Sequence, residues 1–508
     1  MKVYSSILTG LLIFTTLLSF GQPGTLDGDF DADGKVTTDL GPNAAVCWAL
    51  AIQQDGKIIA VGSSGDEFAT VRYQPDGSLD NSFGSNGKVI TTLEGQDYAR
   101  CVALQQDGKI LIAGSVSADF GITIDFGLIR YNSDGSTDNS FSFDGIVVTD
   151  LGGIDRINSM ELQPDGKIVV AGSSSFDFAV ARYNVDGSLD NTFSLDGKVT
   201  TDFGNSNDVG RSVSLQSDGK IVVVGQSYIS SIAESDFASV RYNSDGSLDS
   251  TYGTNGKVLT DFSNAEDRAW SSAIQSDGKI ILAGHAVANG SASFALLRYN
   301  TDGTLDNTFT NGGKVTTSIS IGYDLGHSIA LQPDDKILIA GVTSSGNGDF
   351  ALARYTPDGL LDITFQFGHV TTQFGNDYDE ALAVAVQPDG KIVVGGTSDL
   401  YSKFALARYI SGLNLGVISF SNQDNGMLIY PNPIKESATI EYTLTTTETL
   451  SLDLYNLSGK LVQSLFASEK RSAGRHIEPI ALSAQIASGS YVLTLSNERG
   501  SSSVRITK

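Results

Sequence analysis

The chain has 508 residues, of which 58 are Asp or Glu and 33 are Lys or Arg, so its formal net charge is −25. This acidity opposes nonspecific binding to nucleic acid, because phosphates require a basic protein surface, and no nucleic-acid partner is expected. It is compatible with binding cations or neutral sugars, although charge alone demonstrates neither.

Residues 1–22 are typical of a secretory signal peptide. Lys2 provides the positive start, residues 7–20 form an apolar stretch, and the small Gly21 precedes Gln22. The apolar stretch falls short of the ~20 residues that cross a bilayer, and no other stretch is long and apolar enough. The sequence therefore predicts an exported mature chain without a membrane span.

The region 23–410 is a series of seven sequence repeats. Each ends with the dipeptide Arg-Tyr, and successive copies lie 52 to 59 residues apart. A period of this length marks supersecondary units that cover one another's apolar faces. The arginines of the seven dipeptides are Arg72, Arg130, Arg182, Arg241, Arg298, Arg354 and Arg408.

Four β-rich runs, separated by Gly, Asp and Asn turns, make up each repeat. In the first repeat, residues 24–74, the runs start near Gly34, Cys47, Lys57 and Phe68. Four-stranded antiparallel units in tandem predict an all-β, seven-bladed β-propeller, since four to eight blades can close a ring. An open β-solenoid is less suitable, because its coils are shorter and lack repeated hairpins. The sequence leaves open whether the first strand completes the last blade.

The dipeptide Asp-Gly between the second and third runs predicts a tight hairpin, because such turns require positive φ at their centre. It is Asp55-Gly56 in the first repeat, whereas the sixth repeat has Asp334-Asp335. Asp tolerates the left-handed conformation better than most residues, so the turn is expected to persist there at a cost of about 1 kcal/mol.

The two cysteines, Cys47 and Cys101, fall on equivalent strands of adjacent repeats. Export would permit a disulfide, but strands of neighbouring units usually lie beyond bridging range. Two buried free thiols are therefore favoured.

The repeats resemble the delta-60 repeat family of bacterial exported proteins. The fourth repeat carries a complete set of its motifs, at residues 186–193, 197–202, 218–221 and 237–243, together with Gln216. The resemblance implies a repetitive secreted or surface architecture and no particular reaction.

Composition shifts to Ser, Asn, Asp and Gly over residues 411–426, which is typical of a linker. Residues 427–508 then show short alternating β-runs that predict a small immunoglobulin-like β-sandwich. This tail resembles the C-terminal sorting domain of type IX secretion in Bacteroidetes-type bacteria. The matching residues include Tyr430, Pro431, Asn432, Pro433, Gly459, Gly489, Tyr491 and Lys508.

The resemblance of the tail implies that the type IX secretion machinery is a partner. It further implies Sec export through the periplasm, passage across the outer membrane, and release or attachment at the cell surface. An ordinary sandwich that acts as a binding module is the alternative.

The sequence requires no cofactor or metal. Residues 29–34 imitate the start of a calcium loop, but Leu40 occupies the twelfth position, where a bidentate carboxylate is needed, so a repeat turn is favoured. The four histidines share no metal-type spacing, and neither a nucleophile elbow nor a phosphate loop is present. No catalytic residue can be assigned.

The recurrent arginines and aspartates could be seven copies of a ligand site, but a structural pairing is favoured. A catalytic centre is seldom copied unaltered into every blade, whereas a buried guanidinium always needs carboxylate or carbonyl partners. We expect Arg182 to be held by an aspartate of the repeat framework, such as Asp190.

The segment between the third and fourth runs varies in length between repeats. It is long at residues 115–125 and 226–236, and with residues 285–293 it should rise over one face of the propeller. Binding surfaces often lie on such loops, although an insertion without a ligand is equally compatible. The candidate ligand residues are Asp119, Asp125, Tyr228, Glu234, Asp236 and His285.

These features favour an exported, non-enzymatic binding or surface-scaffold propeller with a surface glycan or a protein as its ligand. The alternative is an extracellular polysaccharide-active enzyme with its site on the loop-rich face. A hydrolase should show a deep central pocket with clustered, non-repeated carboxylates. A scaffold should instead show a channel lined by recurrent small residues.

Overall fold

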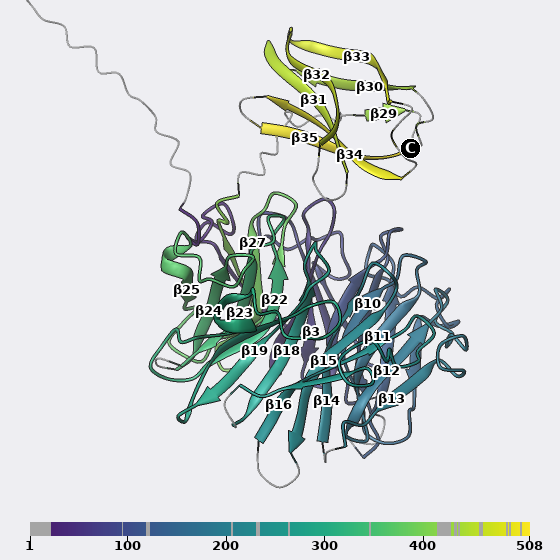
Figure 1. The fold of residues 1–508 in the computed structure, drawn as a ribbon, viewed down its shortest axis with the longest axis vertical. Coiled ribbons are helices and arrows are strands. Elements are labelled where there is room, and N and C mark those ends of the chain that lie inside the picture. Colours follow the sequence, from purple (N-terminus) through teal and green to yellow (C-terminus); the bar gives the residue numbers. More distant parts are fainter. Residues whose placement is uncertain are drawn as a thin grey trace, which may run out of the picture.

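The computed structural model describes residues 22–93, 95–117, 122–204, 207–229, 234–262, 265–344, 347–413, 428–430, 434, 437–444, 446–456, 461–483, 486, 489–497 and 500–508. The predicted signal peptide therefore lies outside the described residues, apart from Gln22. Antiparallel sheets make up almost all of the regular structure (Figure 1). No helix of the described residues has the length and apolar character to cross a membrane.

Seven four-stranded sheets form the blades, which we number along the chain. From the innermost strand outward, the first four blades are β2 (Ala45–Ile52), β3 (Ile58–Ser64), β4 (Glu67–Tyr73) and β5 (Lys88–Thr91); β6 (Tyr98–Leu104), β7 (Ile110–Val116), β8 (Asp125–Tyr131) and β9 (Ile146–Thr149); β10 (Asp155–Leu162), β11 (Ile168–Ser174), β12 (Asp177–Tyr183) and β13 (Lys198–Thr201); and β14 (Asn207–Leu215), β15 (Ile221–Ile229), β16 (Glu234–Tyr242) and β17 (Lys257–Thr260).

Blades 5 to 7 have the same strand order. They comprise β18 (Asp267–Ile274), β19 (Ile280–Ala288), β20 (Ser291–Tyr299) and β21 (Lys314–Thr317); β22 (Asp324–Leu331), β23 (Ile337–Thr343), β24 (Asp349–Tyr355) and β25 (His369–Thr372); and β26 (Glu380–Val386), β27 (Ile392–Ser398), β28 (Lys403–Tyr409) and β1 (Lys35–Asp39). Short 3₁₀ turns, η1 (Thr310–Gly313) and η2 (Gln366–Gly368), precede β21 and β25.

The first strand closes the ring, which answers the question that the sequence left open. β1 pairs with β28, and Val36 lies opposite Leu406 in the antiparallel register. The four-run unit assumed for residues 24–74 is consequently not one blade, because its first run belongs to blade 7. Every blade takes its outermost strand from the following sequence repeat, and this offset joins the two ends of the ring.

The tight turns form as expected. Gly56 has φ 83°, and Asp335 reaches the same left-handed region with φ 59° where the sixth repeat lacks glycine. The calcium-like segment is also a turn, in which the Lys35 amide donates to Asp33 Oδ1 at 2.9 Å. Both cysteines are free and buried.

Apolar side chains of neighbouring blades interdigitate to form the core. Ile59 and Val61 of β3 pack with Ile110 and Ile112 of β7, and all four are fully buried. Equivalent mixed clusters lie at the other junctions. Each blade thus depends on the next to remove its apolar face from water.

The arginine of each Arg-Tyr dipeptide forms a buried ion pair, as expected from the sequence. Arg182 Nε donates to Asp190 Oδ2 at 2.7 Å, and both side chains are about 95% buried. The other pairs are Arg72–Asp80, Arg130–Asp138, Arg241–Asp249, Arg298–Asp306, Arg354–Asp362 and Arg408–Asp27, with Nε–Oδ2 distances of 2.6 to 2.9 Å.

These arginines also link one blade to the next. Arg182 of blade 3 donates through Nη1 to the carbonyl of Ser244 in blade 4, and its guanidinium lies 4.8 Å from the ring centre of Phe193. Burial alone would raise the pKa of Asp190, but hydrogen bonds from Thr192 and Lys167 and the charge of Arg182 hold it well below its usual range. Arg408 donates likewise to the carbonyl of Pro75, which connects blade 7 to blade 1.

The tyrosine of the same dipeptide links each blade to the preceding one. Tyr183 of blade 3 donates through its hydroxyl to Thr149 of blade 2 at 3.0 Å. Tyr73 and Thr38 make the equivalent contact across the closure, at 2.7 Å. Arginine and tyrosine at adjacent positions therefore hold a blade from both sides.

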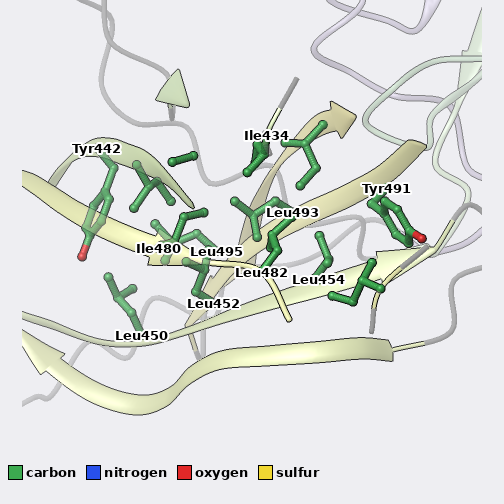
Figure 2. Close-up of a cluster of buried hydrophobic side chains, with 14 of the residues drawn as sticks. Ile434, Tyr442, Leu450, Leu452, Leu454, Ile480, Leu482, Tyr491, Leu493 and Leu495 are labelled. Atoms are coloured by element: carbon green, nitrogen blue, oxygen red, sulfur yellow. The ribbon is translucent and has the colours of Figure 1, made fainter. Parts of the chain in front are cut away.

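Residues 428–508 form two antiparallel sheets. One contains β29 (Leu428–Tyr430), β30 (Ser437–Leu444) and β33 (Gly474–Ala481); the other contains β32 (Leu461–Arg471), β31 (Glu448–Asn456), β34 (Ser490–Asn497) and β35 (Gly500–Thr507). Leu450, Leu452 and Leu454 alternate along β31 and enter a core shared with Tyr442 and Leu493 (Figure 2).

Several residues of the predicted sorting motif support this core and its last turn. Tyr491 is buried in the core (Figure 2), Gly489 and Lys508 exchange two backbone hydrogen bonds of 2.9 Å, and Lys508 Nζ donates to the carbonyls of Ser483 and Ile486. Tyr430 ends β29. Pro431, Asn432, Pro433 and Gly459 lie outside the described residues.

Replacing Arg182 with lysine should lower the Tm of the propeller, because lysine keeps the charge but loses the guanidinium fork that contacts Asp190 and Ser244. The expected loss of unfolding free energy is about 2–4 kcal/mol. Calorimetry of the full chain measures it, with Arg156→Lys at an exposed position as the control. Equal Tm values for Arg182→Lys and wild type would refute the pairing.

Candidate functional site

A small cavity lies on the axis of the ring. It has a volume of about 80 Å³, and each innermost strand contributes one residue to its lining. We call this set the axial ring; its members are Trp48, Arg100, Asn158, Arg211, Trp270, His327 and Leu382.

Every member of the axial ring occupies a β-bulge. In β2 the register with β3 shifts between Cys47 and Ala49, which leaves Trp48 without a partner residue, and the other six innermost strands shift at the equivalent place. A bulge re-aims one side chain and increases the local twist. The bulge recurs in all seven blades, whereas the side chain that it carries changes from blade to blade.

Aromatic and cationic side chains contact one another around the axial ring. The Arg100 guanidinium lies 3.7 Å from the ring centre of Trp48, and that of Arg211 lies 4.3 Å from Trp270. Trp270 meets His327 edge-on at 5.1 Å. His327 Nε2 lies 2.9 Å from Glu380 Oε1, so the axis also holds one imidazole–carboxylate pair.

Arginines gather at one side of the axis although the chain is acidic. Arg156 and Arg100 line an adjoining cavity of about 200 Å³ together with Tyr98, and Arg268 lies nearby on β18. Burial, followed by the charge of Arg156, lowers the pKa of Arg100 to about 10. Burial and the charges of Arg100 and Arg268 likewise lower the pKa of Arg211 to about 10.

Several polar atoms of this region are buried without a hydrogen-bond partner among the described residues. They are Arg268 Nε, Trp270 Nε1, His285 Nδ1, His327 Nδ1 and His327 Nε2, the last of which lies near Glu380 without forming a hydrogen bond to it. An unsatisfied buried donor costs about 1–3 kcal/mol, so such atoms usually face a water or a ligand. Arg268 Nε and Trp270 Nε1 can only donate, whereas an imidazole nitrogen donates or accepts according to its tautomer, so the region can bind a ligand that offers hydrogen-bond acceptors.

The candidate residues chosen from sequence lie in two different places. His285, on β19 opposite Arg268, is 5% exposed, and the Tyr228 ring lies 5.9 Å from the Arg268 guanidinium. Asp125 and Asp236 lie instead at blade junctions, within groups of three carboxylates. Glu234 begins β16. Asp119 lies outside the described residues.

Sequence reasoning missed the axial ring. Arg100, Arg211 and Trp270 occur within runs that otherwise recur in every repeat. The signal that could have revealed them is that one position of this run holds a large residue whose identity changes from repeat to repeat.

A cavity of about 1190 Å³ lies by contrast among residues at recurrent positions of blades 3 to 6, such as Gln163, Gln216 and Gln275. Among the described residues, the small axial cavity is lined neither by clustered carboxylates nor by recurrent small side chains. The cavity of about 1190 Å³ does contain small side chains at equivalent positions of three innermost strands, namely Ser214 of β14, Ala273 of β18 and Ala330 of β22.

Two family models match the chain. The first, described as a domain of unknown function (DUF5122) beta-propeller, matches residues 53–83, 105–141, 163–193, 216–252, 275–309, 332–365 and 387–411. The second, a secretion system C-terminal sorting domain, matches residues 428–508. These matches confirm both resemblances drawn from the sequence.

Solved structures resemble the chain at low identity. Virginiamycin B lyase from Staphylococcus aureus is 11% identical, with a TM-score of 0.43. The match covers 74% of this chain and 99% of the lyase chain. PorZ, a surface component of the type IX secretion system of Porphyromonas gingivalis, is 11% identical, with a TM-score of 0.39 and coverages of 92% and 59%. The polysaccharide lyase Uly1 is 12% identical, with a TM-score of 0.43 and coverages of 78% and 94%. No curated protein sequence matches the chain.

Replacing His285 with glutamine should make the Tm less sensitive to acid. Burial, with the charges of His327, Arg268 and Arg211, lowers the pKa of His285 from 6.5 to about 3, so the imidazole stays neutral in the folded protein. Below pH 6.5 the unfolded chain gains a proton that the folded chain does not bind, which favours unfolding by about 1.4 kcal/mol per pH unit. Calorimetry at pH 7 and pH 5 compares the two proteins, and an identical fall in Tm would contradict this pKa.

Proposed function

We propose that this chain, whose repeats belong to the DUF5122 beta-propeller family and whose tail is a secretion system C-terminal sorting domain, is an exported binding protein for an acidic saccharide. The sorting domain indicates export to the cell surface or secretion. The propeller would then be the cargo, with its ligand site at the axial ring.

The cluster of arginines beside two tryptophans carries this proposal. Guanidinium groups bind carboxylate, sulfate and phosphate through paired hydrogen bonds, and buried, mutually repelling cations gain most from an anion. The rings of Trp48 and Trp270 pack against the guanidiniums of Arg100 and Arg211, which holds these cations in place for an acidic group of the ligand. The combination matches a saccharide with acidic groups better than it matches a neutral one.

We further propose how the chain is divided. Residues 1–22 serve as the signal peptide, residues 23–410 as the binding domain, residues 411–426 as a linker and residues 427–508 as the address read by the type IX secretion machinery. The pairing of β1 with β28 supports residues 23–410 as the extent of the binding domain, because it places both ends of the propeller in one sheet.

A polysaccharide-active enzyme is the second candidate, and the His327–Glu380 pair favours it. His327 Nε2 lies 2.9 Å from Glu380 Oε1, and its ring contacts Trp270, against which the Arg211 guanidinium packs. An imidazole beside a carboxylate has the composition of a general base, and the nearby guanidinium that of an anion-binding group. Such a site would suit acidic saccharides as well, so the two candidates differ in turnover and not in ligand class. Incubating the bound saccharide with the protein and analysing its length separates them.

Replacing Arg211 with glutamine should weaken the binding of an acidic oligosaccharide at least tenfold, because one charge-assisted contact contributes about 1.5–3 kcal/mol. The measurement is an array of uronate-containing, sulfated and neutral oligosaccharides, followed by titration of the tightest ligand with the full chain. We expect binding to acidic members only, with affinity that falls as salt increases.

Lys403→Gln is the matched control, since it removes one positive charge from a half-buried position outside the axial ring. It should bind as tightly as wild type. Preference for neutral saccharides, or equal losses for both variants, would contradict the assignment.

A further inference from the structure

We propose that three carboxylate clusters, one at each junction between blades 2 and 5, bind calcium ions. Each cluster has three aspartates whose ligand oxygens lie within 4.8 Å of one another. We call them the junction clusters. Their members are Asp125, Asp150 and Asp155; Asp177, Asp202 and Asp208; and Asp236, Asp261 and Asp267.

The three members of a junction cluster come from three equivalent positions. In the first cluster Asp125 begins β8 of blade 2, Asp150 comes directly after β9 of the same blade, and Asp155 begins β10 of blade 3. Asp155 is fully buried, Asp125 is half-buried and Asp150 is exposed. The site therefore spans the junction and remains open to water on one side.

Two members of each cluster face each other as like charges. Phe126 pairs with Thr149, so the antiparallel register places Asp125 opposite Asp150. Like charges directly opposite each other destabilise a sheet. The same Asp–Asp opposition recurs in blades 3 and 4, where Phe178–Thr201 and Phe237–Thr260 are the neighbouring pairs. A bound cation would remove this repulsion.

The buried aspartate of the first cluster has an oxygen available for a ligand. Asp155 Oδ2 accepts the Leu151 amide at 2.6 Å, whereas Asp155 Oδ1 is buried without a hydrogen-bond partner among the described residues. A buried, unpaired carboxylate oxygen is costly in isolation. Its position within 4.8 Å of two other carboxylates is the arrangement that a divalent cation requires.

The next junction along the ring lacks the Asp–Asp pair. Ser293 and Ser318 replace the two aspartates and hydrogen-bond each other at 2.8 Å. The buried Asp324 is then fully satisfied, because Thr343 and Ser320 donate their hydroxyls to Oδ1 and Oδ2 accepts the Ile319 amide. Protein groups thus complete the coordination of the buried carboxylate where the other two carboxylates are missing.

The junction between blades 7 and 1 keeps one of the three carboxylates, that of Asp39. Lys403 lies opposite Asp39, and Ala45 replaces the buried aspartate. A cationic side chain thus replaces one carboxylate, and an alanine replaces the buried one. These two junctions with fewer carboxylates therefore have a lysine or hydrogen-bonding hydroxyl groups instead, whereas the three junction clusters have neither in that place.

A lysine borders each cluster but does not neutralise it. Lys198 Nζ donates to the backbone carbonyl of Asp150 at 3.1 Å, and Lys257 and Lys314 contact the carbonyls of Asp202 and Asp261 in the same way. Three carboxylates and one ammonium leave a net charge of −2.

Calcium suits these sites better than a transition metal. The ligands are carboxylate oxygens without histidine or cysteine, and partial exposure leaves room for the waters that complete six to eight contacts. Extracellular modules bind calcium with Kd values of about 10⁻⁴–10⁻³ M, which fits an exported chain. Bound ions would connect blade 2 to 3, 3 to 4 and 4 to 5.

The test is calcium binding by the full chain after treatment with a chelator, measured by titration calorimetry and by Tm with calcium or magnesium alone. Wild type should bind up to three calcium ions, and its Tm should rise with calcium concentration. The triple variant Asp150→Asn, Asp202→Asn, Asp261→Asn should lose both effects. Its Tm in chelator should equal or exceed that of wild type, because the opposed charges are gone.

Asp39→Asn is the matched control, since Asp39 occupies the equivalent position at the junction that has Lys403 and Ala45. It should keep the calcium response of wild type. No calcium-dependent heat or Tm change in wild type would overturn the proposal. An undiminished response in the triple variant, or the same loss in Asp39→Asn, would do so as well.

Discussion

A buried arginine that contacts two blades at once is the interaction on which the structure depends. In each repeat its guanidinium joins the aspartate of its own blade to a backbone carbonyl of the next, as Arg182 does with Asp190 and Ser244. The guanidinium forms these contacts without leaving a buried charge unpaired, and Lys167 shares the same carboxylate. Since Arg408 repeats the contact with Asp27 and Pro75, the ring has no junction at which this link is absent.

Because these framework residues fix the blade geometry, other positions can vary without loss of the fold. The bulge on each innermost strand is part of the recurrent backbone, yet it carries tryptophan, arginine, asparagine, histidine or leucine. The junction positions also vary, from three aspartates to serine pairs or a lysine. The recurrent arginine and tyrosine contacts therefore form the scaffold of the propeller, and the variable bulge and junction positions form its candidate sites.

Features that arise from local chemistry were predictable from the sequence, whereas those that depend on spatial neighbours were missed. The Arg182–Asp190 pair could be foreseen, because a recurrent arginine in a β-rich run needs a partner. The blade boundaries could not be foreseen, because a periodic sequence can be divided into units at any point of the repeat. Only the pairing of Lys35–Asp39 with β28 shows where each blade begins. Arg100 and Trp270 were missed because unlike residues carry no repeat signal. Asp125 was predicted to be a ligand residue of a loop. Its place in a carboxylate cluster could not be predicted, because the cluster includes Asp155, which belongs to the next blade.

Hydrogen exchange of the β1 amides tests the closed ring most directly. If the links around the ring make it one cooperative unit, the amides of Lys35–Asp39 should be protected as strongly as those of Lys198–Thr201, the equivalent strand of blade 3. Exchange of β1 at the rate of a frayed terminus, while β13 remains protected, would contradict a ring closed through its first strand.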